Sequence, residues 1–133
     1  MTIPTSITAA DLTWTPANQP GQPPHFDGDV RRASVPHPAG SDGWSGSNVG
    51  LVRFVNGART YWHQHPGEQI LVVVEGECRY GSETQPAAVA GAGQVIRMPG
   101  GQRHWHGAVA GGSMTHLTIT HGGAAEWFGP VAP

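Results

Sequence analysis

The sequence predicts an all-β fold, a small antiparallel barrel or jelly roll. Twenty glycines and twelve prolines among 133 residues break helices and mark turns. The apolar runs between them are short, and no segment has a convincing helical pattern or an internal repeat. A chain of this length is enough for one domain and too short for two comfortable ones.

The first third of the chain has the composition of an arm rather than of a barrel core. Residues 1–47 are rich in Pro, Gly, Ser and Asp, and a run such as residues 18–24 cannot form a regular helix or a central strand. We expect this Pro- and Gly-rich N-terminal arm to lie over the barrel, with one or two edge strands near residues 26–32. The barrel core is then expected over residues 48–120.

The strands of the core follow from alternation and turn signals. A strand signal over residues 49–55 ends at Asn56-Gly57, a dipeptide that strongly favours a hairpin turn. Residues 69–75 are β-branched and apolar on both faces, which is typical of a central strand. Other strands are expected over residues 63–65, 78–81, 94–98, 104–106 and 114–120, with a loop over residues 82–92. Residues 121–133 form a tail, whose Trp127 and Phe128 are expected to pack on the barrel or on a partner subunit.

The composition limits the classes of partner. Charged residues are sparse, lysine is absent and the net charge is −2 with neutral histidines, so nothing favours binding to nucleic acid or to an anionic membrane. The single cysteine, Cys78, cannot form an intrachain disulfide and is expected to be buried. No apolar run approaches the ~20 residues of a membrane span, and the N-terminus lacks a secretory signal pattern. We expect a cytoplasmic protein that binds a small-molecule substrate.

Two His-x-His segments, His63-x-His65 and His104-x-His106, are the strongest chemical signal. In a strand, residues i and i+2 point to the same side, so two such strands can aim four imidazoles at one point. Imidazole is the commonest protein ligand for mid-row transition metals. Two pairs at matching positions are hard to explain as merely packed histidines. The sequence therefore predicts a divalent metal ion inside the barrel.

The spacing around these pairs resembles both halves of the cupin signature. The residues that carry the resemblance are Gly57, His63, His65, Gln69 and Gly76 in the first half, and Gly93, Pro99, Gly100, Gly101 and His104 in the second. The resemblance covers roughly residues 48–120. It implies a single cupin barrel, a jelly roll, with His63, His65 and His104 as metal ligands. Two positions depart from the pattern, because Gln69 stands where most cupins carry a ligand Glu, and Ala108 stands where the second motif usually ends in Asn.

The sequence leaves three alternatives for the fourth metal ligand. The amide oxygen of Gln69 can bind a divalent ion. Glu68 is a rival, although period two sends it to the other face if the strand is already regular there. A third alternative is that no fourth protein ligand exists. With three histidines and a neutral glutamine, the charge of the metal stays uncompensated, so an anionic substrate or hydroxide should bind more readily than at a glutamate site.

Two further histidines are candidates for catalysis. His106 shares the face of His104 and is a further metal contact, a general base or a packed core residue. His116 shares a face with Thr118 and Thr120, and this polar face suggests the lining of a cavity. The remaining histidines lie in Pro- or Gly-rich segments and are expected to be solvated: His25, His37 and His121.

A narrower resemblance rests on residues 57–69, 99–108 and 114–117. These segments resemble a subgroup of small cupins that contains bacterial manganese-dependent hydroxynitrile lyases and relatives grouped with carboxymuconolactone decarboxylases. By this match the metal residues are His63, His65, Gln69 and His104, the catalytic residues are His106 and His116, and the substrate-pocket positions are Gly50, Val52, Thr118 and Thr120. The resemblance favours Mn(II), with Fe(II), Zn(II) or Ni(II) as other candidates.

Together these features predict a metal-dependent lyase that acts on a small hydroxylated or carbonyl compound, with the metal as Lewis acid and a histidine as acid or base. Cyanohydrin cleavage needs only these parts, and an isomerase or decarboxylase would use them too. One alternative is a metal-dependent dioxygenase, and another is a non-catalytic metal- and ligand-binding barrel. The arm and the Trp127-Phe128 tail offer apolar surface, so a homodimer or homotetramer is expected.

Overall fold

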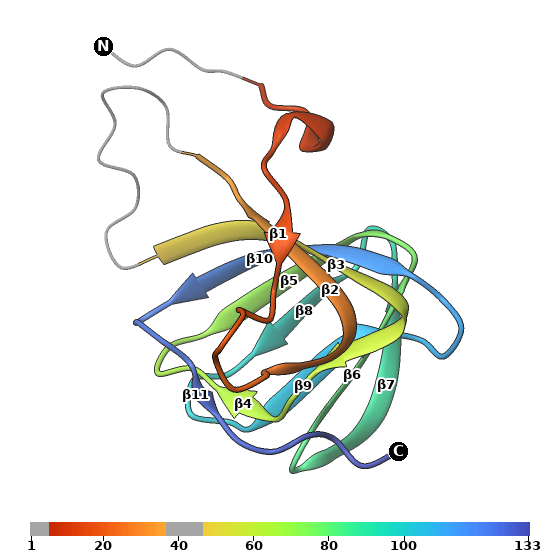
Figure 1. Cartoon of the computed structure of the whole chain (residues 1–133). Helices are drawn as coiled ribbons and strands as arrows, with labels where there is room; N and C mark the ends of the chain where they lie inside the picture. The colour runs from red at the N-terminus through yellow and green to blue at the C-terminus, as the bar shows by residue number, and fades with distance from the viewer. Residues whose placement is uncertain (1–5, 37–46) are drawn as a thin grey trace.

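The computed structural model describes residues 6–36 and 47–133, which form a β-barrel with an arm at its N-terminal side (Figure 1). The all-β prediction is confirmed. The one helical element among these residues is the 3-10 turn η1 (Ala9–Asp11), and nothing in them could cross a membrane as an apolar helix. The strands are β1 (Thr15–Pro16), β2 (Phe26–Ser34), β3 (Ser47–Thr60), β4 (His63–Gln64), β5 (Gln69–Glu75), β6 (Glu77–Ser82), β7 (Gln85–Gly91), β8 (Val95–Met98), β9 (His104–Ala108), β10 (Met114–His121) and β11 (Glu126–Trp127).

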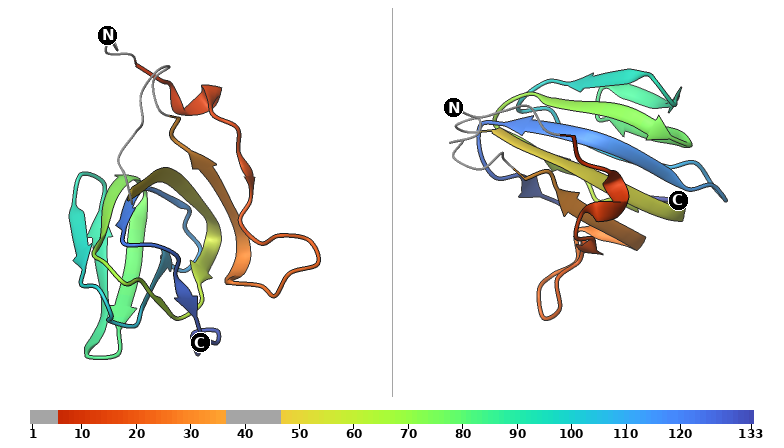
Figure 2. Two further views of the ribbon diagram at one scale, coloured as in Figure 1. Left: turned by 90° about the vertical axis from the view of Figure 1, so that its left-hand side faces the viewer. Right: turned by 90° about the horizontal axis from the view of Figure 1, so that it is seen from above.

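The strands join one antiparallel sheet that curls around a common interior. Its order is β11-β4-β9-β3-β10-β5-β8, with β2 hydrogen-bonded to β3 and the β6–β7 hairpin attached to β9. In Figure 2 the N-terminal segment, drawn in red, projects from one side of this barrel. Apart from β1–β2–β3 and the β6–β7 hairpin, neighbouring strands in the sheet are not consecutive in the chain, so most contacts that shape the interior join residues far apart in the sequence.

β3 runs through residues 47–60 without a break, so the hairpin turn expected at Asn56-Gly57 is wrong. Asn56 and Gly57 do adopt positive φ values, 51° and 77°, the backbone conformation that makes this dipeptide a turn signal. Here they bend one long strand. The part of β3 before the bend pairs with β10, and the part after it reaches β9. The bend therefore lets a single strand pair with two different neighbours.

The loop expected over residues 82–92 is also wrong, because β7 forms a hairpin with β6 there. Among the described residues β7 pairs with no other strand, so it is an edge. Pro86 is tolerated on an edge strand, where a missing N–H can face solvent. Ala87, Ala88 and Val89 are all exposed. The segment therefore lacks the alternation that marks a half-buried strand.

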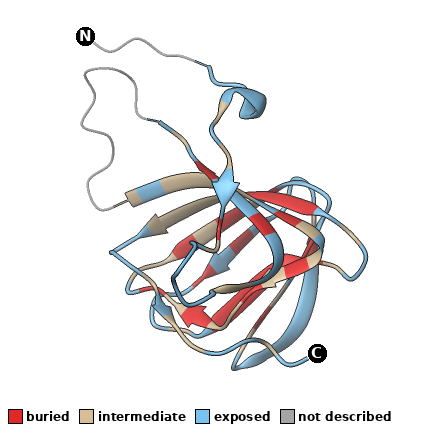
Figure 3. Ribbon diagram, in the orientation of Figure 1, coloured by how far each residue is buried: buried red, intermediate tan, exposed pale blue. Residues whose placement is uncertain are grey.

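The central strand expected over residues 69–75 is confirmed as β5, which lies between β10 and β8. Burial alternates along it, with Leu71 and Val73 inside and Val74 49 % exposed. The core gathers around the fully buried Phe54, Leu71 and Met114. Figure 3 shows the buried segments, in red, on the strands that enclose this interior.

Both ends of the described chain contact the barrel. β1 pairs with β2, which follows β3 along most of its length with a register shift between Asp27 and Asp29. At the other end β11 pairs with β4, which places Trp127 opposite His63. The tail therefore packs on the barrel, one of the two expected positions. The domain limits at residues 47 and 120 stay predictions.

Candidate metal centre

Histidines from two neighbouring strands come together inside the barrel. β4 and β9 pair antiparallel, with His63 directly opposite His104. Because β9 is regular, His104 and His106 point to the same side, and all three rings are buried. One ring nitrogen from each of these three lies within 4.8 Å of the other two. A three-histidine group of this size could hold one divalent metal ion.

The outer nitrogens of His63 and His104 are fixed by the main chain. Nδ1 of His63 donates to the carbonyl oxygen of Tyr61 at 2.9 Å, and Nδ1 of His104 donates to that of Gln102 at 3.1 Å. A neutral imidazole carries one N–H, so Nε2 of each ring presents a lone pair. This is the tautomer that a metal ligand needs.

Gln69 brings an oxygen to the same place. Its Nε2 donates to Oγ1 of Thr118 at 3.0 Å, and this orientation puts its Oε1 3.0 Å from Nε2 of His104. Nε2 of His104 carries no proton in the tautomer described above, so two lone pairs point at each other. A cation between them replaces this repulsion with attraction. The donor set therefore fits a divalent metal ion.

His65 follows the end of β4 and lies at the edge of the group. Its ring centroid is 5.3 Å from that of His63 and 5.9 Å from that of His104. Both of its ring nitrogens are buried without a hydrogen-bond partner among the described residues. Such nitrogens are costly to bury unless a further ligand reaches them, so His65 also fits a place at the metal. Glu68, the alternative fourth ligand, instead pairs with Arg97 at 2.9 Å, away from this group.

His106, a member of the group, forms a hydrogen-bonded pair with His116. Nε2 of His116 lies 3.0 Å from Nδ1 of His106, and the main-chain N–H of His106 donates to Oγ1 of Thr60. Nε2 of His106 is buried and has no partner within the part of the chain that the structure describes. His106 thus uses one nitrogen to contact His116 and keeps the other for a metal, a substrate or a proton.

Burial keeps these rings neutral at physiological pH. Desolvation, followed by the charge of His104, lowers the pKa of His63 to about 3. Burial lowers the pKa of His104 and that of His116 to about 4. The same cause, followed by the charge of His116, holds the pKa of His106 well below its ordinary value, and burial also lowers the pKa of His65. Neutral imidazoles offer the lone pairs that metal binding and proton acceptance both require.

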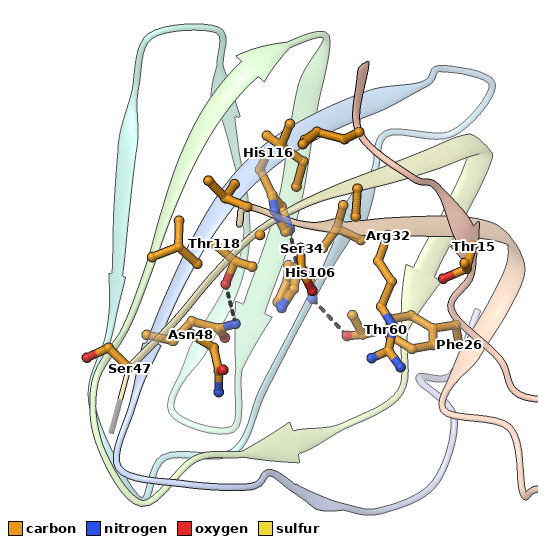
Figure 4. Close-up of a pocket in the computed structure, with 18 of the residues that line it drawn as sticks. Thr15, Phe26, Arg32, Ser34, Ser47, Asn48, Thr60, His106, His116 and Thr118 are labelled. Carbon is orange, nitrogen blue, oxygen red and sulfur yellow. Dashed lines mark hydrogen bonds between the residues drawn. The ribbon is translucent and has the colours of Figure 1, made fainter. Parts of the chain in front are cut away.

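A cavity of about 1070 Å³ extends from the histidines toward the mouth of the barrel (Figure 4). Gly50, Val52 and Thr118, three of the expected substrate-pocket positions, line it, whereas Thr120 is not among the lining residues. The hydroxyl of Thr118 also accepts the hydrogen bond from Gln69. Thr118 is therefore placed to orient the side chain of Gln69 as well as to line the cavity.

Three cavity residues, Phe26, Arg32 and Trp127, carry no site signal in the sequence. Trp127 stacks on His63 with ring centroids 4.5 Å apart, and His25 stacks on the same tryptophan at 4.3 Å. His25 lies in a loop, as expected, but it is only partly solvated because its ring packs on Trp127. Aromatic residues in the arm and tail suggest that these segments pack on the barrel. No local sequence pattern indicates that they contact one of its histidines.

The two remaining histidines expected in loops differ in what can be said of them. His121 is exposed, as expected, and its Nδ1 lies 2.8 Å from Oγ of Ser47. His37 lies outside the described residues. Cys78 is buried as expected, and burial raises the pKa of its thiol to about 12. Of the two groups that the structure describes here, neither the His121 ring nor the Cys78 thiol belongs to the histidine group.

Known proteins share this sequence pattern and this fold. A family model described as a cupin domain matches residues 50–124. An (R)-mandelonitrile lyase from Granulicella tundricola is 41 % identical over 81 residues, which cover 57 % of this chain and 60 % of that protein. This chain therefore spans less than two thirds of that relative.

Solved structures agree with the family match. A cupin-like protein from Thermotoga maritima is 36 % identical with a TM-score of 0.74, over 81 % of this chain and 82 % of that chain. The polyketide cyclase RemF from Streptomyces resistomycificus has a TM-score of 0.71 at 16 % identity, over 90 % of this chain and 80 % of that chain, a likeness of fold alone. The resemblance seen in the two histidine motifs is confirmed, and the chain belongs to the cupin family.

Proposed function

We propose that the protein is a metal-dependent lyase that acts at a carbon bearing a hydroxyl or carbonyl oxygen, with a cyanohydrin as the simplest substrate. The observation that carries the proposal is the His106–His116 pair: His106 is a neutral, buried imidazole of the histidine group, it is hydrogen-bonded to a second titratable ring, and one of its nitrogens has no partner among the described residues. Metal binding alone does not need a histidine that is hydrogen-bonded to a second titratable ring. The similarity to a mandelonitrile lyase supports the same reaction class.

The remaining donors would hold the metal. We assign this task to His63, His65, His104 and Gln69, on the strength of their inward lone pairs and of the unpartnered nitrogens of His65. Manganese(II) is the ion we propose, with iron(II), zinc(II) and nickel(II) as alternatives. When bound, a divalent metal supplies a Lewis acid for the hydroxyl or carbonyl oxygen of the substrate.

His106 would move the proton. Its Nε2 takes the hydroxyl proton of the cyanohydrin, and the resulting positive charge is stabilised because Nδ1–H donates to Nε2 of His116. As the carbonyl double bond forms, the carbon–carbon bond breaks and its electron pair leaves with cyanide. The proton then passes from His106 to cyanide, which departs as hydrogen cyanide. The neutral ring is restored without any net change in the protein.

The test measures product formation and oxygen consumption in the same reaction. Metal-loaded protein is mixed with (R)- or (S)-mandelonitrile, and we expect benzaldehyde to form without oxygen uptake and to stop when a chelator is added. Oxygen consumption in step with product would show an oxygenase instead. An absence of turnover with mandelonitrile and with a panel of aliphatic cyanohydrins would contradict the proposal. His121→Ala, at an exposed histidine outside the cavity, is the matched control for His106→Ala and should keep full activity.

A further inference from the structure

Arg32 differs from the other arginines of this chain. Each of the other six has a partner among the described residues: carboxylates for Arg31, Arg53 and Arg97, main-chain carbonyls for Arg59, and aromatic rings for Arg79 and Arg103. The side chain of Arg32 has no ion pair, hydrogen bond or ring contact with any residue within 6–36 or 47–133. Instead it lines the cavity that leads to the histidines.

The register of β2 explains why this side chain meets the cavity. Arg32 lies opposite Val52, and Val30, two residues earlier, lies opposite the buried Phe54. Side chains two apart in a strand share a face, so Arg32 points to the same side as the buried Val30, while Arg32 itself is exposed. Figure 4 shows its side chain extending toward Phe26 and Thr60, and Thr60 in turn is hydrogen-bonded to the buried His106.

A chain of stacked rings connects the surroundings of Arg32 to the metal centre. After burial, the positive charge of Arg32 is the cause that lowers the pKa of His25, so the guanidinium lies near that ring. His25 stacks on Trp127, and Trp127 stacks on His63. Phe26 and Trp127 contact each other, with ring centroids 5.5 Å apart, and both line the cavity. The path from the guanidinium to the histidines is thus walled by aromatic rings.

The cavity has little negative charge to offset this arginine. Among the described residues that line it, Asp11 is the one acidic side chain, and it forms no ion pair with Arg32. The histidines and Gln69 are neutral ligands, so a divalent metal would add its full charge to the same space. A substrate with a negative group would meet favourable potential along the whole cavity.

We propose that Arg32 is a specificity-determining residue that binds a carboxylate on the substrate, at the end remote from the oxygen at the metal. A guanidinium matches a carboxylate with two parallel hydrogen bonds, and the ring edges of Phe26 and Trp127 would contact the apolar body between the two ends. The substrate class is therefore a hydroxyl or carbonyl compound that also carries a carboxylate. This inference rests on the proposed function, because it assumes that the reacting oxygen lies at the metal.

The test uses two aldehydes of the same shape that differ in charge. Metal-loaded protein is titrated calorimetrically with 4-carboxybenzaldehyde and with 4-carbamoylbenzaldehyde, its neutral amide, at low ionic strength where an exposed charge is least screened. The variants are Arg32→Gln and Arg31→Gln. Arg31 is the matched control because it is adjacent, lies on the opposite face of β2 and pairs with Asp29. Metal content and circular dichroism confirm that each variant is loaded and folded.

We expect the wild-type protein to favour the carboxylate, and Arg32→Gln to lose about tenfold of this preference, the usual size of a hydrogen-bonded charge contact. Arg31→Gln should keep the preference. A wild-type protein that binds the two aldehydes equally, or binds neither, would overturn the inference, and so would a preference that survives in Arg32→Gln. Mandelonitrile turnover is measured on the same preparations. Turnover without a carboxylate preference would contradict the role of Arg32 and leave the lyase proposal intact. An Arg32-dependent preference without turnover would contradict the lyase proposal and leave Arg32 as an anion-binding residue.

Discussion

The two His-x-His segments have the same spacing and different surroundings. In β9 both histidines lie within one regular strand, so His104 and His106 share a face and are both buried. In the first segment β4 ends at Gln64, so His65 lies beyond the strand and at the edge of the group. Period two therefore places a pair of side chains reliably only where the strand continues through both residues.

His104 and His106 are equivalent by their spacing in β9, but the hydrogen-bond partners of their Nδ1 atoms differ. Nδ1 of His104 donates to the main-chain carbonyl of Gln102, a partner that cannot change its protonation state. Nδ1 of His106 instead meets Nε2 of His116, a second titratable ring. A ring fixed by the main chain suits a metal ligand, and a ring joined to another imidazole suits proton transfer. We infer that ligand and proton carrier stand two residues apart in β9.

The largest effects are expected at the first pair. His63→Ala and His65→Ala should each lose most of the bound metal and all measurable turnover, because each removes one of few strong ligands. Elemental analysis by mass spectrometry of purified protein measures the loss. If His65→Ala keeps a full equivalent of metal while His106→Ala loses it, the ligands are the group within 4.8 Å, namely His63, His104 and His106.

Acid should destabilise the metal-free protein strongly. Histidines have a pKa near 6.5 in the unfolded chain, and burial lowers the pKa of His63 to about 3 and those of His104 and His116 to about 4. Below pH 6.5 the unfolded chain therefore binds more protons than the folded one, and stability falls steadily as the pH drops toward 3. We expect the melting temperature to be at least about 5 °C lower at pH 5 than at pH 8. Calorimetry with equal melting temperatures at the two pH values would refute buried neutral rings.

Gln69→Glu should separate metal affinity from catalysis. The carboxylate adds a negative charge, so the metal should be retained better after dialysis against a chelator. The same charge weakens the metal as a Lewis acid, so turnover should fall by about tenfold. Unchanged turnover would indicate that residue 69 does not contact the metal.

A smaller effect on metal affinity is expected at Thr118, the hydrogen-bond partner of Gln69. Thr118→Val removes the acceptor for the amide of Gln69 and frees that side chain to rotate, so metal affinity should weaken by about tenfold. Thr120→Val is the comparison, because its hydroxyl lies 3.4 Å from that of Thr118 but Thr120 lies outside the cavity lining and has no hydrogen bond to Gln69. Competition with a fluorescent chelator gives both affinities. Equal values for the two variants would mean that Thr118 does not orient the ligand.

Local patterns in the sequence were enough for the parts of the site that lie on regular strands. His104 and His106 share a face, Gln69 points inward while Glu68 pairs outside, and His116 and Thr118 line the cavity. Each of these placements depends only on the alternation of side chains along one strand. They could therefore be predicted before any strand pairing was known.

The other features of the fold and the site depend on pairings between segments that are distant in the sequence. Asn56-Gly57 adopts the backbone of a turn, but the neighbours of β3 on either side of it make it a bend within one strand. Trp127 reaches His63 only because β11 pairs with β4, and Arg32 reaches the cavity only because β2 pairs with β3. No local pattern specifies these pairings, so neither residue could be assigned to the site from the sequence.

The central claim is that His104 binds the metal and His106 carries the proton. It is tested most directly by measuring metal content and turnover together in His104→Ala and His106→Ala. We predict that His104→Ala loses its metal and its activity together. His106→Ala should keep a full equivalent of metal and lose about 10²–10⁴-fold in mandelonitrile turnover, the usual contribution of a positioned acid or base. A His106→Ala protein that is folded, metal-replete and fully active, or one that loses metal as completely as His104→Ala, would contradict the assignment of His106 as the proton carrier.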